Sequence, residues 1–520
     1  MNTDIRANGA DHLTSTNTEP IDVLNESIGK NSARDITRFS SLDPNLMIEI
    51  GRNKSLKLFH EASERVPAYS KFLKEHDINP KSIKKYSDFL KVPWTDKENY
   101  FKKYSLNDIA WDGKIEKANM IARSSGSSGN PFFWPSDNRQ VDEVSYFYEN
   151  VFRSMFGMPK KSTLVIIAYG MGSWVAGTMS LLAGAKIAEK TNTTFITPGY
   201  NRKEVVEIVE KLGFYFEQIV ICAYPPLLKE IIDTGLAMEL DWTLYNIKYI
   251  FGAESISEEF RDYMHEVAGI KSSLMGSMNT IGSADAMVLG HETPVSIAVR
   301  RFLGQNDKVK LFNDNRMPTL AQYYPWQKDL FIQEDELILT VNSGVPLIRY
   351  NIHDNANIFQ YDEINEKLKI AGTSTAKLVE SVQSSSVNYD WKLPFVAIYG
   401  KSTNAVKFYG AFIYPENIKA ALELPHNARV LSGKFLIKVG YDESHNQMIE
   451  LTLEANMNRD PLGIDITKLK NDIVQTILKL NSEYVAVHND IGEKSEPIIS
   501  IVEYGNPNFK YTIKHKYTKD

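Results

Sequence analysis

Cysteine is nearly absent from this chain, and that scarcity already excludes several classes of protein. The single cysteine among 520 residues, Cys222, excludes an intrachain disulfide and a metal site built from several thiolates. The ten histidines include no HExxH pair. Basic residues (59) are fewer than acidic residues (65), so the net charge of −6 gives no electrostatic footprint for nucleic acid. A reducing compartment fits this composition, and we expect a cytoplasmic protein.

Long hydrophobic runs are also scarce, and the one candidate for a membrane span is interrupted. No residue between Lys161 and Lys186 is charged, which is length enough to cross a bilayer. Gly170 and Gly172 divide this segment into a β-rich run, TLVIIAY, and a later helix-like run. We therefore predict a buried strand, a glycine turn and a packed helix, with no membrane span.

The order of strand-like and helix-like segments predicts an α/β fold. Strand-like TLVIIAY, FEQIVICA and IKYIFGA alternate with helix-like segments, which is typical of a mostly parallel sheet with covering helices. Later segments are strand-rich and predict a β-rich subdomain, and the C-terminal part predicts a small α+β unit. We predict three parts: a polar, mobile arm at residues 1–40, a large domain at 41–402 and a small mobile domain at 403–520.

A serine- and glycine-rich loop, RSSGSSGNP, lies between strand-like NMIAR and an aromatic, helix-like segment. Glycine lets successive N–H groups point at one anion, serine hydroxyls add donors, and a following helix adds a positive N-terminus. No GK[ST] follows, so this is not a Walker A loop. An ordinary surface loop is the alternative. The predicted phosphate-binding residues are Ser124, Ser125, Gly126, Ser127, Ser128 and Gly129.

Three later segments carry residues suited to binding a nucleotide. FGAES follows a strand-like run and precedes a helix, with Ser255 and Glu258 at capping-box spacing. IGSADAMVLG contains Asp285 after a turn of small residues. PLIRYNIHDNA contains Asp354, whose carboxylate offers two acceptor oxygens to a diol. An ordinary βα turn and a turn-forming aspartate are the alternatives for the first and last.

In this order, the motifs resemble those of adenylate-forming enzymes: acyl- and aryl-CoA ligases, luciferases and peptide-synthetase adenylation domains. SSGSSGNP resembles the phosphate loop [ST]SG[ST]TGxP of that superfamily. The lead-in RVPAYSKFLKEHDINPKSIKKYSDFLKVPWTDKENY is closer to the phenylacetate-CoA ligase and capsule-protein-K-like branch. The resemblance runs from about residue 55 to 420 and weakens towards the C-terminus.

The resemblance implies a nucleotide site. FGAES is similar to GAEP, whose backbone holds adenine, and IGSAD is similar to YGxxE, which places Asp285 at the magnesium-coordinating carboxylate. A rival alignment on MGSMNT puts Asn279 there. Asp354 matches the acid that accepts hydrogen bonds from the ribose hydroxyls. The implied nucleotide-binding residues after the loop are Gly252, Ala253, Glu254, Ser283, Asp285, Asp354 and Lys401.

The C-terminal motifs imply a moving small domain. YGKSTNAVKFYGAFIYPENI is similar to the hinge motif GRxDDxIxxxGxxVxPxxIE, with Lys401 in place of its arginine and Thr403 and Asn404 at the hinge. In the tail NPNFKYTIKHKYTKD, Lys510 best matches the catalytic lysine, and Lys514 and Lys516 are rivals. The small domain is then a lid on an ATP- and acid-binding domain.

The function implied is ATP-dependent activation of a small carboxylic acid as an acyl-adenylate, followed by transfer to CoA. ATP, Mg²⁺ and CoA as co-substrate are the expected cofactors, and a homodimer is left open. Tyr169, Trp174 and Gly252 are expected at the acid pocket and favour a flat or apolar acid, with simple core packing as the alternative. Two alternative functions are transfer to an amine or a carrier-protein thiol, and a degenerate nucleotide-binding homologue. Departures from the motifs motivate the second: Ile281, Asp285, Lys401 and Phe509.

Overall fold

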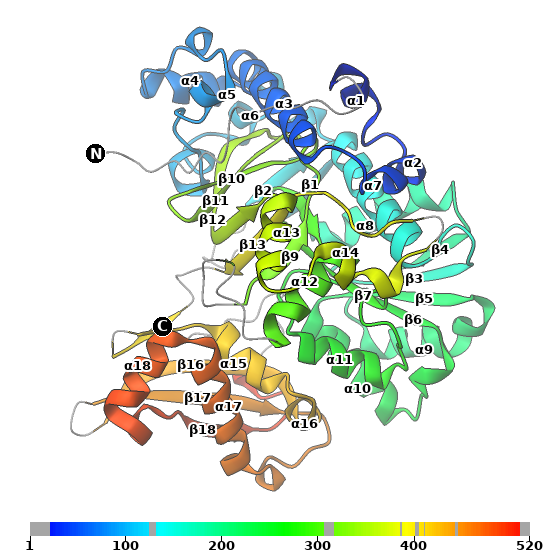
Figure 1. Ribbon diagram of the computed structural model, residues 1–520, viewed down its shortest axis with the longest axis vertical. Helices are drawn as coiled ribbons and strands as arrows, with labels where there is room; N and C mark the ends of the chain where they lie inside the picture. Colours follow the sequence, from blue (N-terminus) through cyan, green and yellow to red (C-terminus); the bar gives the residue numbers. More distant parts are fainter. Residues whose placement is uncertain are drawn as a thin grey trace.

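An eleven-stranded sheet forms the centre of the large domain (Figure 1). The computed structural model describes residues 21–123, 132–305, 312, 317–384, 387–400, 405–409, 411–442 and 446–509. In spatial order the strands are β10 (Asp329–Gln333), β11 (Glu336–Val341), β12 (Leu347–Phe359), β13 (Phe395–Gly400), β9 (Thr319–Gln322), β8 (Met287–His291), β7 (Ser277–Ser283), β6 (Ile247–Phe251), β5 (Gln218–Ala223), β3 (Thr163–Ala168) and β4 (Thr193–Ile196).

The two halves of this sheet differ in strand direction. Strands β7, β6, β5, β3 and β4 pair in parallel, whereas β10 to β13, β9, β8 and β7 pair antiparallel. Every residue of β3 and of β5 is buried, as expected for parallel strands covered on both faces. The predicted α/β class is confirmed. The β-rich part continues the same sheet and does not form a separate one.

Helices cover both faces of the parallel half (Figure 1). Leu164, Ile166 and Ile221 pack towards α9 to α11, while Val165 and Val220 face α7 and α8 because side chains alternate along a strand. The helices are α7 (Asn138–Met155), α8 (Val175–Ala188), α9 (Arg202–Leu212), α10 (Pro225–Ala237) and α11 (Glu258–Val267).

The uncharged segment folds as β3 and α8, joined by a turn in which Gly172 has a φ of +73°. This confirms the predicted strand, glycine turn and helix. Within the described ranges, we find no helix with the length and apolar character needed to cross a membrane.

The antiparallel half has its own covering helices. Phe59 of α3 packs with Leu337 and Tyr350 on one face, and Ile297 of α12 packs with Leu320 on the other. The helices are α3 (Pro44–Arg65), α4 (Pro67–Glu75), α5 (Tyr86–Phe89), α6 (Leu106–Ile109), α12 (Pro294–Gln305), α13 (Tyr361–Ile370) and α14 (Thr375–Leu378). A separate hairpin pairs β1 (Met120–Arg123) with β2 (Phe133–Ser136).

Residues 21–40 differ from the predicted mobile arm. They form α1 (Ile21–Ser27) and α2 (Ser32–Arg38), and Leu24 and Phe39 are fully buried in the core of the large domain. The few apolar residues in this polar segment recur at helical spacing, which is enough for two short helices to dock. The predicted arm is therefore wrong for residues 21–40.

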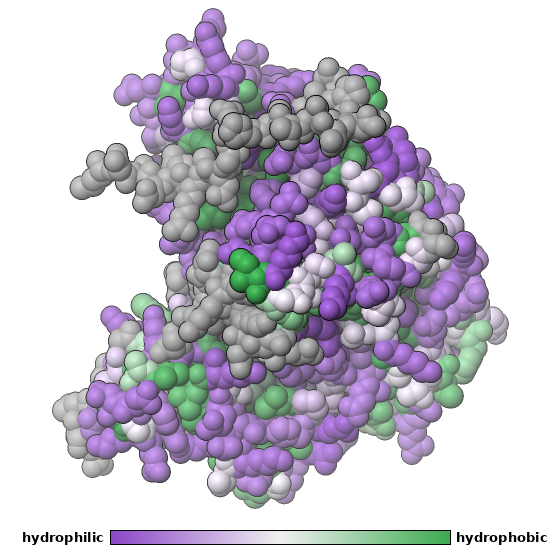
Figure 2. All heavy atoms as spheres, in the orientation of Figure 1, coloured by the Kyte–Doolittle hydropathy of each residue, from purple (hydrophilic) through white to green (hydrophobic). Residues whose placement is uncertain are grey.

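The C-terminal part folds around a core of its own and lies at the lower left in Figure 1. Its sheet has the order β16-β17-β18. The elements are β14 (Val406–Phe408), β15 (Ala411–Ile413), α15 (Pro415–Leu422), α16 (Pro425–Ala428), β16 (Leu431–Tyr441), β17 (Gln447–Ala455), α17 (Ile466–Leu480), α18 (Ser482–Ile491) and β18 (Ile498–Val502). Figure 2 shows a mainly hydrophilic surface on this side, with small separate hydrophobic areas.

Phe39→Ala tests whether residues 21–40 belong to the core. Its ring centroid lies 4.9 Å from that of Trp391 and 5.8 Å from that of Tyr324, so the change leaves a cavity. We expect a loss of about 3–5 kcal/mol in the free energy of unfolding, measured by denaturant titration. Val23→Ala, at a side chain that is 49% exposed, is the control and should be nearly neutral. Wild-type stability in Phe39→Ala would contradict this placement.

Candidate active site

The turn after β6 presents backbone groups at the edge of the sheet where parallel sheets bind ligands. It runs through Gly252, Ala253 and Glu254. A Cβ atom on Gly252 would lie 2.9 Å from Thr280 Oγ1 and 3.0 Å from Tyr169 Oη, so a side chain there would have to displace Thr280 or Tyr169. Ala253 has a φ of +72°, which is a strained conformation for a residue other than glycine. Such strain is characteristic of functional turns.

Hydrogen bonds from β7 hold this turn in place. Asn279 Nδ2 donates to the Glu254 carbonyl at 2.8 Å, and Thr280 Oγ1 donates to the Phe251 carbonyl at 3.1 Å. The Asn279 side chain, the rival candidate for the metal position, therefore braces this turn. Its Oδ1 atom is buried and has no hydrogen-bond partner among the residues described.

A buried ionic cluster contacts the backbone of β7. No sequence pattern predicted this cluster. Arg261 Nη2 donates to both oxygens of Glu292, at 2.8 and 2.7 Å, and both side chains are fully buried. Glu292 Oε2 also accepts from the backbone N–H of Asn279 at 2.7 Å. Glu258 lies 3.0 Å from Arg261 Nε and 2.7 Å from Arg300 Nη1. The cluster thus joins α11 and α12 to the strand that braces the turn.

The cap of α11 differs from the predicted capping box. Ser257, not Ser255, is the N-cap, and its hydroxyl accepts from the Phe260 backbone N–H at 3.0 Å. Glu258 occupies the first turn of the helix and is paired with Arg261 instead of reaching back to the cap. In the sequence, a capping box is recognised only by the spacing of its two residues. In the fold, Arg261 and Arg300 attract the Glu258 carboxylate and turn it away from the cap.

Asp285 lies beyond the end of β7, at the same sheet edge as the Gly252 turn because β6 and β7 run parallel. Its Oδ2 accepts from the Tyr350 hydroxyl at 2.6 Å and lies 3.4 Å from Lys97 Nζ. Its Oδ1 is buried without a hydrogen-bond partner in the described structure. Ser283 closes the turn around this acid, since its hydroxyl accepts from the Ala286 backbone N–H at 3.3 Å.

Electrostatics keep this carboxylate ionised. Burial alone raises the pKa of Asp285, but the positive charge of Lys97 and hydrogen bonding by Ser283 and Tyr350 outweigh it, so the pKa lies below its ordinary value. Lys97 was not predicted as a functional residue. The available signal was its place in PWTDKENY, at the end of the lead-in that resembles the phenylacetate-CoA ligase branch.

The donor set at Asp285 fits Mg²⁺ that arrives with phosphate. Mg²⁺ is commonly held by one or two carboxylates and completes its coordination with water and phosphate oxygens. Asp285 offers one ionised carboxylate with an unused oxygen. In the described part of the chain, no cluster of three or more His, Cys, Asp or Glu side chains could hold a metal ion.

Asp354 lies within β12 and not in a turn after a strand. The next residue, Asn355, pairs with Gly400 at the end of β13. Four residues earlier on the same strand, Tyr350 contacts Asp285. Strand β12 therefore carries Asp354, which the motifs assign to ribose, and also contacts Asp285, which they assign to the metal.

Tyr169 and Trp174 flank the glycine turn between β3 and α8. Tyr169 is buried, and its hydroxyl donates to the Ile250 carbonyl at 3.1 Å beside Gly252. Burial raises the pKa of this hydroxyl well above its ordinary value, so it stays neutral. The guanidinium of Arg123 lies 5.2 Å from the Trp174 ring centroid. Strand β1, which ends at Arg123 before the serine loop, therefore contacts Trp174 of the predicted acid pocket.

The flanks of the serine–glycine loop differ from the predicted strand–loop–helix order. Arg123 of β1 pairs with Phe133 of β2, so the loop joins the strands of a hairpin and α7 begins only after β2. Asp137 caps α7 and accepts from the Arg139 backbone N–H at 3.0 Å. The positive end of this helix therefore faces its own capping carboxylate.

The remaining predicted site residues lie outside the described residues: Ser124, Ser125, Gly126, Ser127, Ser128, Gly129, Lys401, Thr403, Asn404 and Lys510.

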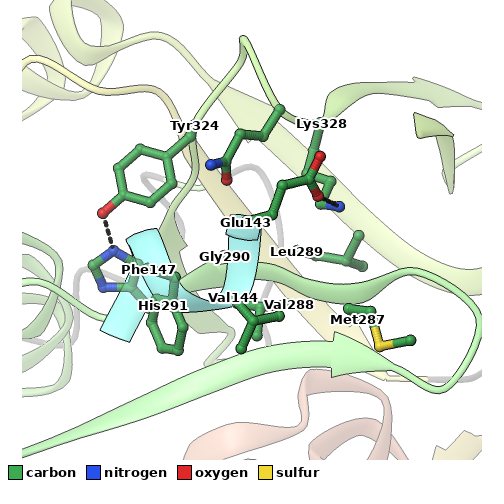
Figure 3. A pocket seen from close by; sticks show the side chains of 11 residues that line it. Glu143, Val144, Phe147, Met287, Val288, Leu289, Gly290, His291, Tyr324 and Lys328 are labelled. Carbon is green, nitrogen blue, oxygen red and sulfur yellow. Dashed lines mark hydrogen bonds and ion pairs between the residues drawn. The ribbon is translucent and has the colours of Figure 1, made fainter. Parts of the chain in front are cut away.

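A small internal pocket lies between α7, β8 and the segment 324–328 (Figure 3). Figure 3 shows Glu143 paired with Lys328, at 2.6 Å, and His291 facing the Tyr324 hydroxyl, at 2.8 Å. The cavity measures about 10 Å³. That is room for about one water molecule, which excludes an acid or a nucleotide.

The fold matches that of solved adenylate-forming ligases. The chain aligns with a 2-hydroxyisobutyryl-CoA ligase in the postadenylation state, in complex with R3-HIB-AMP, with a TM-score of 0.63 at 13% identity. The alignment covers 92% of this chain and 89% of that one. An open conformation of that ligase, in complex with 2-HIB-AMP and CoA, aligns with a TM-score of 0.51 at 13% identity over 92% and 91%.

Among curated proteins, the chain is similar to two phenylacetate-coenzyme A ligases. The protein from Escherichia coli is 23% identical over 299 residues, which are 56% of this chain and 63% of that protein. The protein from Thermus thermophilus is 24% identical over 220 residues, 42% and 47% of the two chains. The matched regions thus span less than two thirds of these relatives. No protein-family profile matches the chain. The predicted resemblance to the phenylacetate-CoA ligase branch is confirmed.

Asp285→Asn tests the ionisation of the candidate metal ligand. Because its pKa is lower in the folded than in the unfolded chain, ionised Asp285 stabilises the fold at neutral pH. This contribution is lost as the pH falls below about 4, the ordinary carboxyl value, and through the folded pKa. We expect the stability advantage of wild type over Asp285→Asn, from urea titrations, to shrink across this range. Tyr350→Phe should show an intermediate effect, and an advantage that grows in acid would contradict the pKa shift.

Proposed function

We propose that this chain activates a carboxylic acid with ATP, forms an acyl-adenylate with release of pyrophosphate, and transfers the acyl group to CoA. The observation that carries this proposal is Asp285, a buried carboxylate with one unused oxygen, placed beside Lys97 at the sheet edge that bears the Gly252 turn. The fold of a CoA ligase and the similarity to phenylacetate-CoA ligases support the same reaction.

In this proposal, Lys97 and a Mg²⁺ ion held by Asp285 neutralise the negative charge of the phosphates. A carboxylate must approach the α-phosphate of ATP, so two anions meet and their charge needs neutralising. Asp285 would hold Mg²⁺, and the bound ion supplies positive charge to the phosphate oxygens. Lys97 has a side chain that is 42% exposed, so its ammonium group is accessible to a phosphate as well as to Asp285.

The turn and the strands around it would bind the rest of the nucleotide. The backbone at Gly252 would contact adenine, because its strained and closely packed turn exposes main-chain groups in a fixed orientation. Asp354 would accept hydrogen bonds from the ribose hydroxyls. The full proposed set is Ser124, Ser125, Gly126, Ser127, Ser128, Gly129, Gly252, Ala253, Glu254, Ser283, Asp285, Asp354 and Lys401.

The acid would bind near Tyr169 and Trp174. A neutral tyrosine and an indole offer flat, mainly apolar surfaces, which favour an aryl or apolar acid. The small domain, from residue 403 onwards, would act as a lid that turns at Thr403 or Asn404. Its Lys510 would reach the acid and the α-phosphate during adenylation and leave before the thiol attacks.

A pyrophosphate-exchange screen over aryl, fatty and amino acids tests the reaction. We expect exchange with a carboxylic acid and release of AMP that depends on CoA. Exchange without CoA-dependent AMP release would favour an amine or a carrier-protein thiol as the acceptor. Exchange confined to amino acids would contradict the acyl-CoA assignment, and no exchange with any acid would favour a degenerate binding protein.

Asp285→Asn and Lys97→Met test the charge-handling pair. Each change removes one charged group aimed at the phosphates, so we expect exchange to fall by roughly 100-fold. Lys102→Met is the matched control, because Lys102 lies on the same short segment but pairs with the exposed Glu98. An equal loss in Lys97→Met and Lys102→Met would point to a general defect of their segment and not to a role of the Lys97 charge.

Lys510→Ala tests the assignment of the lid lysine. We expect pyrophosphate exchange to fall by roughly 100-fold, since a cation that meets the developing charge is lost. Thioester formation from synthetic acyl-adenylate should change little, because the lysine serves the first step only. Lys514→Ala and Lys516→Ala serve as comparisons, and a larger loss in either would move the catalytic role to that residue.

A further inference from the structure

The small domain contacts the nucleotide turn itself through a buried lysine. Lys419 Nζ, on α15, lies 2.9 Å from Glu254 Oε2 and donates to the Ser255 carbonyl at 2.6 Å. The Lys419 and Glu254 side chains are only 11% and 12% exposed. One helical turn later, Glu423 accepts from the Ser257 backbone N–H at 2.9 Å. The helix thus holds the segment 254–257 at both ends.

The contact is strong enough to fix the turn. Burial lowers the pKa of the Lys419 ammonium, but Glu254 and Glu423 more than compensate, so its pKa is raised and it remains charged. A buried charge that loses its partner is costly, so Lys419 and Glu254 stay paired as long as the small domain is docked. The Ser255 carbonyl adds direction to the attraction, because a hydrogen bond to a carbonyl oxygen is favoured near the plane of the C=O group.

We propose that Lys419 is a positioning residue that orders the adenine-binding turn only while the small domain is docked, so that docking and nucleotide binding favour each other. The two states are the docked arrangement described above and an arrangement in which α15 has left the turn. Only the first contains the contacts to Glu254 and Ser255, which supplies the required difference in binding between states. The effects are reciprocal: docking strengthens ATP binding by the factor by which ATP strengthens docking. This inference rests on the proposed function, since it takes the turn to bind adenine.

A second ionic contact between the domains provides an internal control. Lys434 Nζ, on β16, lies 2.7 Å from Glu230 Oε1 on α10, and its side chain is 14% exposed. Glu230 also pairs with Arg202 of α9, at 2.9 Å. These contacts hold the same small domain to the large one, but they do not touch segment 254–257. Loss of either lysine weakens docking, whereas only Lys419 acts on the turn directly.

Calorimetric titration of the full chain with Mg·ATP separates the two roles. We expect Lys419→Met to raise the Kd for ATP by roughly 10-fold, within the usual range of coupling between sites. Lys434→Met should raise it by no more than about 2-fold, as long as the small domain stays docked in at least half of the molecules and Lys419 still contacts the turn. Equal losses in both variants, or an unchanged Kd in Lys419→Met, would overturn the role of Lys419.

Glu254→Gln tests the same contact from its other side, in case Lys419→Met fails to fold. It removes the charge of the partner but keeps its shape, and its effect on the Kd should not add to that of Lys419→Met in the double variant, because one contact is lost in each. Full additivity would overturn the proposal. If wild type fails to bind ATP, the proposed function falls together with this inference. If wild type binds ATP and the Lys419 variants bind it with the same Kd, the inference alone falls.

Discussion

The buried pair between Arg261 and Glu292 is the contact on which the candidate site depends. Both side chains are fully excluded from water, so each charge needs its partner. Glu292 in turn holds the backbone of Asn279, and the Asn279 side chain holds the Glu254 carbonyl. The carboxylate of Glu254 then meets Lys419 of the small domain. A continuous set of polar contacts therefore runs from the centre of the large domain, through the turn at residues 252–254, to the small domain.

The continuity of the sheet explains why an acid and a glycine turn meet at one edge. The turn follows a strand of the parallel half, whereas Tyr350, which orients Asp285, belongs to the antiparallel half. Lys97 comes from a third region, near the N-terminal helices. A rigid sheet fixes the distances between such contributions, since its strands cannot move independently. The same sheet keeps the carboxylate buried, where its charge interacts most strongly with a cation.

Local patterns predicted much of the fold, and their errors have definite causes. Alternating strand-like and helix-like segments correctly indicated an α/β architecture, and Gly170 and Gly172 correctly divided the uncharged segment. The polar composition of residues 21–40 concealed two helices, because a few buried residues such as Phe39 outweigh many exposed polar ones. Spacing also misplaced the cap of α11, where two serines lie close together and only the surrounding backbone selects Ser257.

By itself, the sequence determined the order of the elements, the glycine turns between them, and the acids that the motifs single out. These features are encoded by neighbouring residues, so periodicity and spacing reveal them. Only the tertiary structure decided which charges meet. Tyr350 and Asp285 are 65 residues apart, Arg261 and Glu292 are 31 apart, and Lys419 and Glu254 are 165 apart. Such pairs leave no local pattern, because their contact exists only after the chain has brought distant elements together and excluded water from between them.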